Sequence, residues 1–297
     1  MRKRLDIDIA GIAPGPGGEA VPELANGEIK SFPDYRLMLD ETRPEAAIVS
    51  PIFGYNAEVS IECIKRGINV LCEKPVAVTE EELDRLERTV KESSVRFSAM
   101  HYLRFSPAFY EGARLTKAGV IGKPVLITAQ KSYRWGTDRP EWYSDRKLYG
   151  GTIPWIGIHA IDWIYAFTGM KFASVSAIHT GRPERTALCQ YELENGAMAS
   201  VSIDYYRPDG SKSHGDDRIR AVGDKGIVEI SGGNVTLITE KEETTYRPSF
   251  APDLTLDFLD GKETIPMDEI FYLTRIALAS RDAADSGRKI MTGEIKL

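Results

Sequence analysis

The chain has 297 residues, of which 42% are hydrophobic and 28% charged, the balance of a globular protein rather than of a disordered or fibrous one. Its 38 Lys and Arg against 44 Asp and Glu give a net charge of −6 without a basic patch, so we expect no nucleic-acid partner. No apolar run approaches the ~18 residues of a membrane helix, so we expect no membrane association, and the length favours two domains.

About the first hundred residues alternate short strand-like runs with helical ones. Alternating apolar residues at Leu5–Ala13 predict the first strand, and three more strands and two helices follow. This alternation is typical of a parallel sheet of the doubly wound kind, with helices on its faces. The later strands are expected at Ala46–Ser50, Ile68–Cys72 and Val95–Met100, and the helices at Asn56–Arg66 and after the capping residue Thr79.

After about residue 120 the pattern changes to many strands separated by short polar turns. It predicts a large, mostly antiparallel sheet, a helix at Trp155–Phe167 and a last helix at about Asp268–Asp285. The expected fold class is therefore α/β plus α+β: a Rossmann-like domain at 1–104 and an α+β domain at 105–297. The strands of the large sheet are expected at Val125–Trp135, Ala173–His179, Ala187–Leu193, Ala197–Tyr206, Arg218–Val222, Gly226–Ile230 and Val235–Thr239.

The large sheet predicts a homo-oligomer. Only one of its faces can be covered within the chain, and the alternating residues Val201, Ile203 and Tyr205 give the sheet apolar character. Large exposed apolar patches usually mark interaction sites, so we expect copies of the chain to associate through this sheet.

The segment Gly15–Ala20 spells G-x-G-x-x-A directly after the first predicted strand, which is the pattern of a loop that cradles a dinucleotide pyrophosphate. Two prolines speak against that role. Pro16 removes a backbone donor inside the loop, and Pro22 interrupts the helix that should follow. We therefore favour a simple Pro/Gly turn.

Two motifs carry a stronger signal. Glu73-Lys74-Pro75 ends a predicted parallel strand, where open α/β sheets bind ligands, and Gly150-Gly151 precedes His159 and Asp162 on one predicted helix. Together with further pieces in the same order, they resemble the Gfo/Idh/MocA family of nicotinamide-dependent sugar and polyol dehydrogenases over nearly the whole chain. The further pieces are Phe32–Tyr35, Ser50-Pro51, Arg104–Pro107 and Gly119–Gly122.

The resemblance implies that the Rossmann-like sheet is N-terminally truncated. Family members carry one more strand–loop–helix unit, with the phosphate-binding glycines, before the strand expected at Leu5–Ala13. We therefore expect Met1 to be an internal or misassigned start, or else the nucleotide site to be lost. At the position that reads the adenosine ribose, Ala13 and Pro14 offer no carboxylate.

The resemblance also implies the site residues. Lys74 and His159 are expected to carry the proton transfer, with NAD or NADP as cofactor and no metal ion. Two positions depart from the family pattern: Asn56 stands where many members have His, and Trp155 stands where an Asp usually precedes the catalytic His. The residues expected to bind the cofactor are Ser50, Pro51, Asn56, Glu73, Lys74 and His101.

Aromatic and cationic residues gather ahead of Gly150. Such a segment can line a polyol pocket, because aromatic faces stack on sugars and Arg binds carboxylates or hydroxyls, or it can form a dimer interface. We favour the pocket, with Lys74, Arg134, Trp142, Trp155 and His159 as substrate-binding residues. The cluster comprises Tyr133, Arg134, Trp135, Arg139, Trp142, Tyr143 and Arg146.

The function expected from these features is NAD(P)-dependent oxidation and reduction of a small-molecule sugar, polyol or related hydroxy compound. Two alternatives stay open: a non-catalytic or cofactor-deficient relative that binds a small molecule or a partner, and an enzyme that uses a tightly held nicotinamide for non-redox chemistry. Three cysteines without paired spacing indicate free thiols and a reducing compartment, so we expect a cytoplasmic protein.

Overall fold

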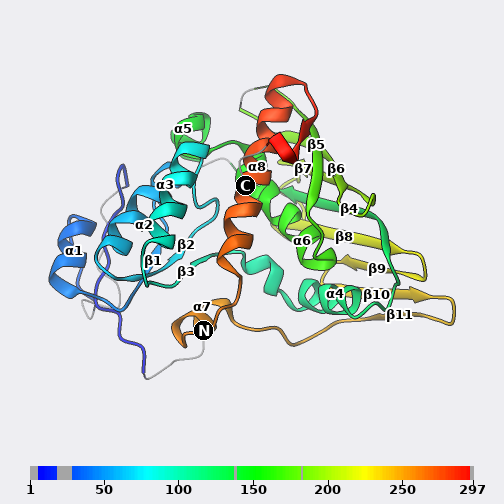
Figure 1. Cartoon of the computed structure of the whole chain (residues 1–297), viewed down its shortest axis with the longest axis horizontal. Coiled ribbons are helices and arrows are strands. Elements are labelled where there is room, and N and C mark those ends of the chain that lie inside the picture. The colour runs from blue at the N-terminus through cyan, green and yellow to red at the C-terminus, as the bar shows by residue number, and fades with distance from the viewer. Residues whose placement is uncertain (1–5, 19–28, 137–138, 182, 295–297) are drawn as a thin grey trace.

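The computed structural model describes residues 6–18, 29–136, 139–181 and 183–294. Two sheets form separate layers, and the helix α8 (Met267–Ser286) runs between them (Figure 1). Among the described residues, no helix is long and apolar enough to cross a membrane.

The smaller layer is a three-stranded parallel sheet in the order β1-β2-β3. Its strands are nearly continuous apolar runs, and the central β2 is buried on both faces, whereas Ile48 of the edge strand β1 is 58% exposed. Helix α3 starts at a capping box, in which the Thr79 hydroxyl accepts from the backbone N–H of Glu82 while the Glu82 carboxylate accepts from that of Thr79. The elements are α1 (Tyr35–Thr42), β1 (Ala46–Val49), α2 (Asn56–Lys65), β2 (Asn69–Cys72), α3 (Glu80–Lys91) and β3 (Phe97–Ala99).

The strand predicted at Leu5–Ala13 is wrong over its described part. Leu5 lies outside the described residues, and among residues 6–13 only Ile12 makes a β-bridge, to Ser31. Ile7 and Ile9 are 36% and 55% exposed. Alternating apolar residues form a strand only where neighbouring backbone pairs with them, and here that pairing is limited to one residue.

The Gly-rich segment forms a turn in its described part. The backbone N–H of Gly18 donates to the Gly15 carbonyl, and Gly17 has a positive φ of 70°. A Cβ on Gly15 would lie 2.3 Å from Pro51, so this backbone is packed tightly against the segment that follows β1. The turn is thus confirmed, while the helix that a phosphate-binding loop would open lies outside the described residues.

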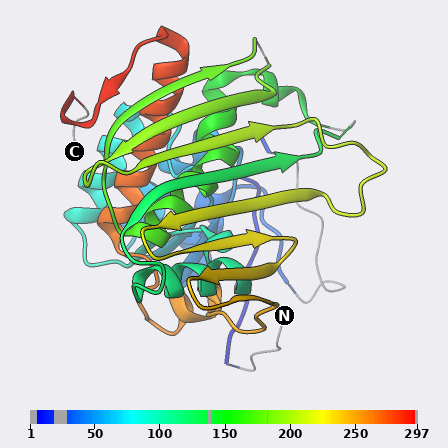
Figure 2. The ribbon, with the colours of Figure 1, turned by 90° about the vertical axis from the view of Figure 1, so that its right-hand side faces the viewer.

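The larger layer is a nine-stranded sheet in the order β11-β10-β9-β8-β4-β7-β6-β5-β12. All its pairs are antiparallel except β4 with β7. Helices α4 (Pro107–Lys117) and α6 (Ile158–Thr168) cover one face, and the opposite face carries no helix (Figure 2). The strands are β4 (Pro124–Tyr133), β5 (Phe172–His179), β6 (Thr186–Leu193), β7 (Met198–Asp204), β8 (Gly215–Gly223), β9 (Gly226–Ser231), β10 (Asn234–Thr239), β11 (Glu243–Tyr246) and β12 (Ile290–Met291).

The three apolar residues that were expected on the open face of the large sheet lie on its covered face. Val201, Ile203 and Tyr205 are at most 2% exposed and belong to the core beneath the sheet. A period of two shows that alternate residues share a face, but it does not tell which face is covered. The open face instead carries mostly polar residues, together with the exposed apolar side chains of Leu188 and Met198. The argument for an oligomer from Val201, Ile203 and Tyr205 is therefore wrong.

Helix α8 joins the two layers. Ile270, Phe271 and Leu278 pack into the core of the small sheet, while Leu273 and Ile276 pack into the core of the large one. The C-terminal segment therefore contributes to both cores, and the boundary near residue 104 stays a prediction. The remaining short helices are η2 (Phe53–Tyr55), η3 (Tyr102–Phe105), η4 (Glu141–Ser144), α5 (Arg146–Tyr149), the π-helical η5 (Ile153–Gly157), α7 (Leu254–Leu259) and η6 (Thr292–Glu294).

Candidate active site

The site begins at the carboxyl end of β2, where Glu73, Lys74 and Pro75 form a turn with a cis Lys74–Pro75 bond. Asn56, at the start of α2, holds this turn: its side-chain amide donates to the carbonyls of Glu73 at 2.9 Å and Pro75 at 2.8 Å. Asn56 is fully buried, and its Oδ1 has no hydrogen-bond partner in the described part of the chain. Its amide group thus positions Lys74 through the backbone.

Lys74 is a buried ammonium next to the large layer. Its Nζ donates to the carbonyl of Trp155 at 2.7 Å and lies 3.7 Å from the Glu73 carboxylate. Burial lowers the pKa of Lys74 to about 8, although the Glu73 charge opposes that shift. Burial likewise raises the pKa of Glu73. A lysine in this state can exchange a proton near neutral pH, which a solvated turn lysine cannot.

His159 lies in the first turn of α6, directly after the π-helical η5. It is 7% exposed, and its Nδ1 has no hydrogen-bond partner among the described residues. Burial, followed by the nearby charges of Lys74 and Lys131, holds the pKa of His159 well below 6.5. The imidazole is therefore neutral at physiological pH, with a ring nitrogen free to bind a ligand.

His101 follows β3 and faces His159 edge to face, with ring centroids 6.3 Å apart. It is fully buried, and burial lowers its pKa to about 4. Its Nδ1 lies 3.5 Å from Oδ1 of Asp162, which accepts from Arg104 Nε at 3.0 Å. Arg104 in turn donates to Glu269 of α8 at 2.6 Å. Asp162 is thus occupied by Arg104 and does not replace the carboxylate missing at Trp155.

Lys131 and Asp217 form an ion pair that the sequence analysis missed. They are directly opposite each other on β4 and β8, and Lys131 Nζ donates to the two carboxylate oxygens at 2.8 and 2.7 Å. Lys131 is 0% exposed, and its ammonium lies 5.3 Å from the centre of the Trp163 ring. Its charge acts on both His159 and Lys74, so it helps to set their proton affinities.

Four aromatic rings pack on one another to form what we call the aromatic box, and its Trp155 ring lies beside Lys74. Trp155 stacks on Tyr205 at 5.6 Å between centroids and meets Tyr143 edge to face at 5.1 Å, while Trp135 meets Tyr205 at 4.9 Å. The ammonium of Lys74 lies 5.3 Å from the Trp155 ring centre. The departure from Asp to Trp155 thus gives this site an aromatic wall where a carboxylate was expected.

The other predicted site residues lie around these groups. Ser50 and Pro51 follow β1 and line a small hollow with Ala13 and Gly15. Trp142 stacks on Tyr143 with centroids 3.9 Å apart, at the outer edge of the aromatic box. The Arg134 side chain contacts the carbonyl of Ser211, and its buried Nε has no partner within residues 6–18, 29–136, 139–181 and 183–294.

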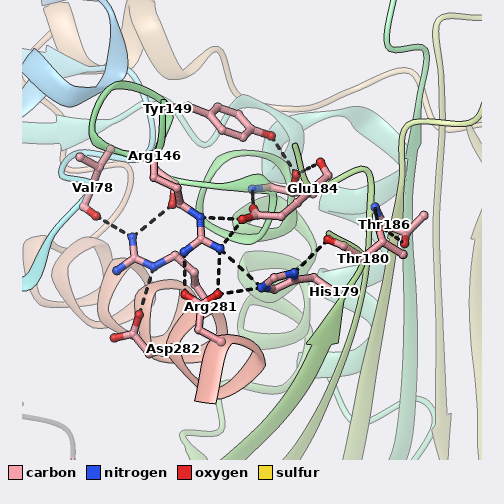
Figure 3. Close-up of polar contacts among 12 residues, drawn as sticks. Val78, Arg146, Tyr149, His179, Thr180, Glu184, Thr186, Arg281 and Asp282 are labelled. Carbon is pink, nitrogen blue, oxygen red and sulfur yellow. Dashed lines mark hydrogen bonds and ion pairs between the residues drawn. The ribbon is translucent and has the colours of Figure 1, made fainter. Parts of the chain in front are cut away.

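Arg146 is drawn away from the pocket. Its guanidinium binds Glu184 and also Asp285 of α8, which accepts from His179 of β5 at 2.8 Å (Figure 3). Nearby, Arg281 of α8 donates to the carbonyl of Val78 at 2.7 Å (Figure 3). This network fastens the segment before Gly150 to the large sheet and to α8, so Arg146 supports the site rather than lining it.

Comparison with known proteins gives two family matches. Residues 12–101 match the oxidoreductase family with an NAD-binding Rossmann fold, and residues 111–229 match the GFO/IDH/MocA C-terminal domain. The solved structure of a Thermotoga maritima oxidoreductase is 36% identical, with a TM-score of 0.90 over 97% of this chain and 94% of that one. A levoglucosan dehydrogenase solved with NADH and levoglucosan has a TM-score of 0.78 over 90% of this chain and 84% of that one; at 16% identity it shares the fold.

Curated relatives are more distant. A 2,7-anhydro-N-acetylneuraminate hydratase of Mediterraneibacter gnavus is 27% identical over 57% of this chain and 45% of the relative. Inositol 2-dehydrogenase 2 of Saccharopolyspora erythraea is 26% identical over 71% of this chain and 61% of the relative. The chain thus spans about half the length of the curated relatives it matches.

Proposed function

We propose that this chain, which belongs to the Gfo/Idh/MocA family of oxidoreductases, is an NAD(P)-dependent dehydrogenase that acts on a secondary alcohol of a sugar, polyol or related hydroxy compound. One observation carries the proposal. Buried Lys74, from one layer, lies close enough to His159, from the other, for its charge to lower the pKa of His159 at the carboxyl end of β2. This is where sheets of this type bind their ligands.

A nicotinamide fits the polar groups at this edge of the small sheet. The ring nitrogens of His101, the Nδ1 of His159 and the Oδ1 of Asn56 are buried without hydrogen-bond partners among the described residues. Buried polar atoms in a folded protein normally have partners, so unpaired ones in one place indicate a missing ligand. We propose that Ser50, Pro51, Glu73, Lys74 and His101 hold the cofactor, with Asn56 positioning Lys74.

The bound nicotinamide would supply the chemistry that amino acids lack, namely the acceptance and return of a hydride. The chain's own residues handle the proton. His159, neutral at physiological pH, accepts the proton of the substrate hydroxyl, and the Lys74 ammonium donates a hydrogen bond to the oxygen that becomes more negative. In the reverse direction the same two groups return the proton to a carbonyl oxygen.

The aromatic box supports a sugar-like substrate. The half-buried Trp155 lies beside Lys74, and aromatic side chains commonly line the pockets that bind sugar rings. We propose that Trp155 and Trp142 contact the substrate and that Arg134 lies at the margin of the same pocket.

We also propose a cytoplasmic homo-oligomer. The three cysteines, Cys63, Cys72 and Cys189, are all buried and unpaired, which suits a reducing compartment. We propose that copies associate through the helix-free face of the nine-stranded sheet, and the exposed apolar side chains of Leu188 and Met198, rather than Val201, Ile203 and Tyr205, support this (Figure 2). Light scattering of the purified chain tests the association, and a monomer at micromolar concentration contradicts it.

Activity measurements with matched variants test the main proposal. The full chain is assayed with NAD⁺ and NADP⁺ against neutral polyols, sugars and sugar acids, as wild type and as Lys74→Ala, His159→Ala and the exposed-lysine control Lys117→Ala. We expect each of the first two changes to lower kcat by ~10²–10⁴-fold, the usual contribution of a positioned acid or base, and the control to leave it unchanged.

Two results would overturn the proposal. Activity that survives both substitutions would show that the proton transfer lies elsewhere. Absence of nicotinamide binding by the folded wild-type chain, measured by fluorescence titration with NADH and NADPH, would instead support a non-catalytic, ligand-binding protein.

A further inference from the structure

The aromatic box encloses an arginine of the same chain. The Arg139 guanidinium carbon lies 4.7 Å from the ring centres of Trp135 and Tyr143, 4.8 Å from that of Trp155 and 5.2 Å from that of Tyr205. Cation–π contacts at such distances stabilise a guanidinium but do not neutralise its charge. The box therefore holds a full positive charge beside the candidate catalytic groups.

A second arginine lies against the same box. The guanidinium carbon of Arg185, just before β6, is 4.8 Å from the ring centre of Trp135. Neither Arg139 nor Arg185 forms an ion pair with a carboxylate of the described residues. By contrast, Arg104, Arg146 and Arg275 each pair with at least two carboxylates. Two guanidinium groups on one ring, neither with a counter-charge from the described residues, favour the binding of an anion.

Arg139 is also held in a defined orientation. Its Nε donates to the carbonyl of Trp135 at 2.5 Å, and its Nη2 to that of Arg134 at 3.3 Å. A guanidinium has five N–H donors, so these two bonds fix the group and leave donors for a ligand. The planar fork of arginine matches a carboxylate with two parallel hydrogen bonds.

The charge lies within reach of the reacting groups. Lys74 Nζ and Arg139 Cζ lie 5.3 and 4.8 Å from the centre of the same Trp155 ring, so the sum of these two distances is the upper limit of their separation. A separation within this limit is short enough for one sugar-sized molecule to span. Its hydroxyl-bearing carbon would lie by Lys74 and His159, and its anionic group by Arg139.

We propose that Arg139, with Arg185 beside it, forms a carboxylate-binding subsite, and that the substrate is a sugar acid rather than a neutral sugar or polyol. This inference rests on the proposed dehydrogenase function and narrows its substrate class. A cationic substrate is excluded by repulsion, because the box already holds a guanidinium. A neutral polyol would leave the two arginines without a counter-charge in the complex.

Matched pairs of compounds test the proposal. The wild-type chain is given an aldohexose and the uronic acid of the same configuration, and a polyol and the corresponding aldonic acid, with both nicotinamides. The variants are Arg139→Gln, Arg139→Lys and Arg185→Gln, with the exposed Arg288→Gln as control. Calorimetric titration of the same acids onto the chain, with and without nicotinamide, gives a measure of binding independent of turnover.

We expect kcat/KM for the acids to exceed that for the neutral partners. We also expect Arg139→Gln to lower kcat/KM and affinity for the acids by about 10–100-fold, the usual effect of a charge-assisted hydrogen bond, while neutral compounds change by less than about threefold. Arg139→Lys should retain part of the preference, since it keeps the charge but loses the fork. Arg288→Gln should match wild type.

Three results would overturn the subsite. The first is equal or better use of the neutral compounds by the wild type. The second is an equal loss on acids and neutral compounds in Arg139→Gln, which would make Arg139 a structural residue of the box. The third is no calorimetric binding of any acid, whatever the activity on neutral compounds. Acid binding that depends on Arg139 but is accompanied by no redox turnover would uphold the subsite and reject the dehydrogenase.

Discussion

We expect a single substitution to have its largest effect on stability at the buried ion pair of Lys131 and Asp217. Replacing Asp217 by Asn keeps the size of the side chain and removes its charge. The Lys131 ammonium, 0% exposed, then loses two hydrogen bonds of 2.8 and 2.7 Å to a carboxylate. Of its contacts with described residues, it keeps the Tyr133 hydroxyl at 3.3 Å and the rings of Tyr133 and Trp163. A buried charge in this state gives up its proton.

The size of the effect follows from the pKa of Lys131, which burial lowers to about 8 against the opposing charge of Asp217. A pH of 7 is thus about one unit below the pKa of Lys131, so removing the proton from its ammonium at this pH costs about 1.4 kcal/mol. The loss of hydrogen bonds to a charged partner adds about 1–3 kcal/mol. The free energy of unfolding should therefore fall by about 2–4 kcal/mol, close to the roughly 3–5 kcal/mol typical of a broken buried pair.

The pH dependence has a defined sign. The fold of the variant favours neutral Lys131, whereas its unfolded chain binds a proton, so the variant gains stability as pH rises. Wild type holds the proton in both states up to its folded pKa of about 8. The stability deficit of Asp217→Asn should thus grow by about 1.4 kcal/mol from pH 7 to pH 6 and shrink toward pH 8.

Urea unfolding of wild type, Asp217→Asn and Asp216→Asn between pH 6 and pH 8 measures this deficit. Asp216 is the matched control, because it neighbours Asp217 but pairs with Arg218, whose side chain is 53% exposed, and such pairs contribute about 0–1 kcal/mol. A deficit that is the same for both variants, or that does not change with pH, would refute a buried, charged Lys131.

Two further substitutions and the pH dependence of activity have definite expected outcomes. Asn56→Ala leaves two backbone carbonyls without their donor and should lower the free energy of unfolding by about 2 kcal/mol or more, as measured by urea unfolding. Gly112→Ala would place a Cβ 2.6 Å from the Phe167 ring and should cost about 1–3 kcal/mol, visible as a lower Tm; an unchanged Tm would contradict this packing. The pKa of Lys74 is about 8, so kcat/KM for alcohol oxidation should fall above pH 8 as the ammonium loses its proton. The pKa of His159 lies well below 6.5, so kcat/KM should not decline as the pH is lowered to 6.5. A decline near pH 6.5 in the measured pH profile would contradict a neutral His159.

Short-range signals predicted much of this fold. Thr79 caps α3, and the apolar run of Asn69–Cys72 forms a parallel strand whose end carries Lys74, since capping and strand patterns depend on neighbours in sequence. The prediction at Leu5–Ala13 was wrong because a strand also needs a paired neighbour, which the alternation does not reveal.

The sequence predicted only those site residues that a local motif marks. Lys74 and His159 stood out because motifs mark them, whereas the partnership of Lys131 and Asp217 depends on the register of β4 against β8, 86 residues apart. Register across a large sheet is set by tertiary packing, and a lone Lys in a strand carries no local sign of burial. Arg139 was noticed only as one member of an aromatic and cationic cluster, because its enclosure requires the fold.

Transfer of a hydrogen label tests the central claim most directly. The wild-type chain is incubated with a carbonyl substrate and reduced nicotinamide cofactor that carries two deuterons at C4, and the product is analysed by mass spectrometry and NMR. The account predicts one deuteron on the carbinol carbon of the product and the loss of that transfer in Lys74→Ala and His159→Ala. A product that carries hydrogen from solvent at that carbon, or no conversion by a chain that binds the labelled cofactor, would contradict it.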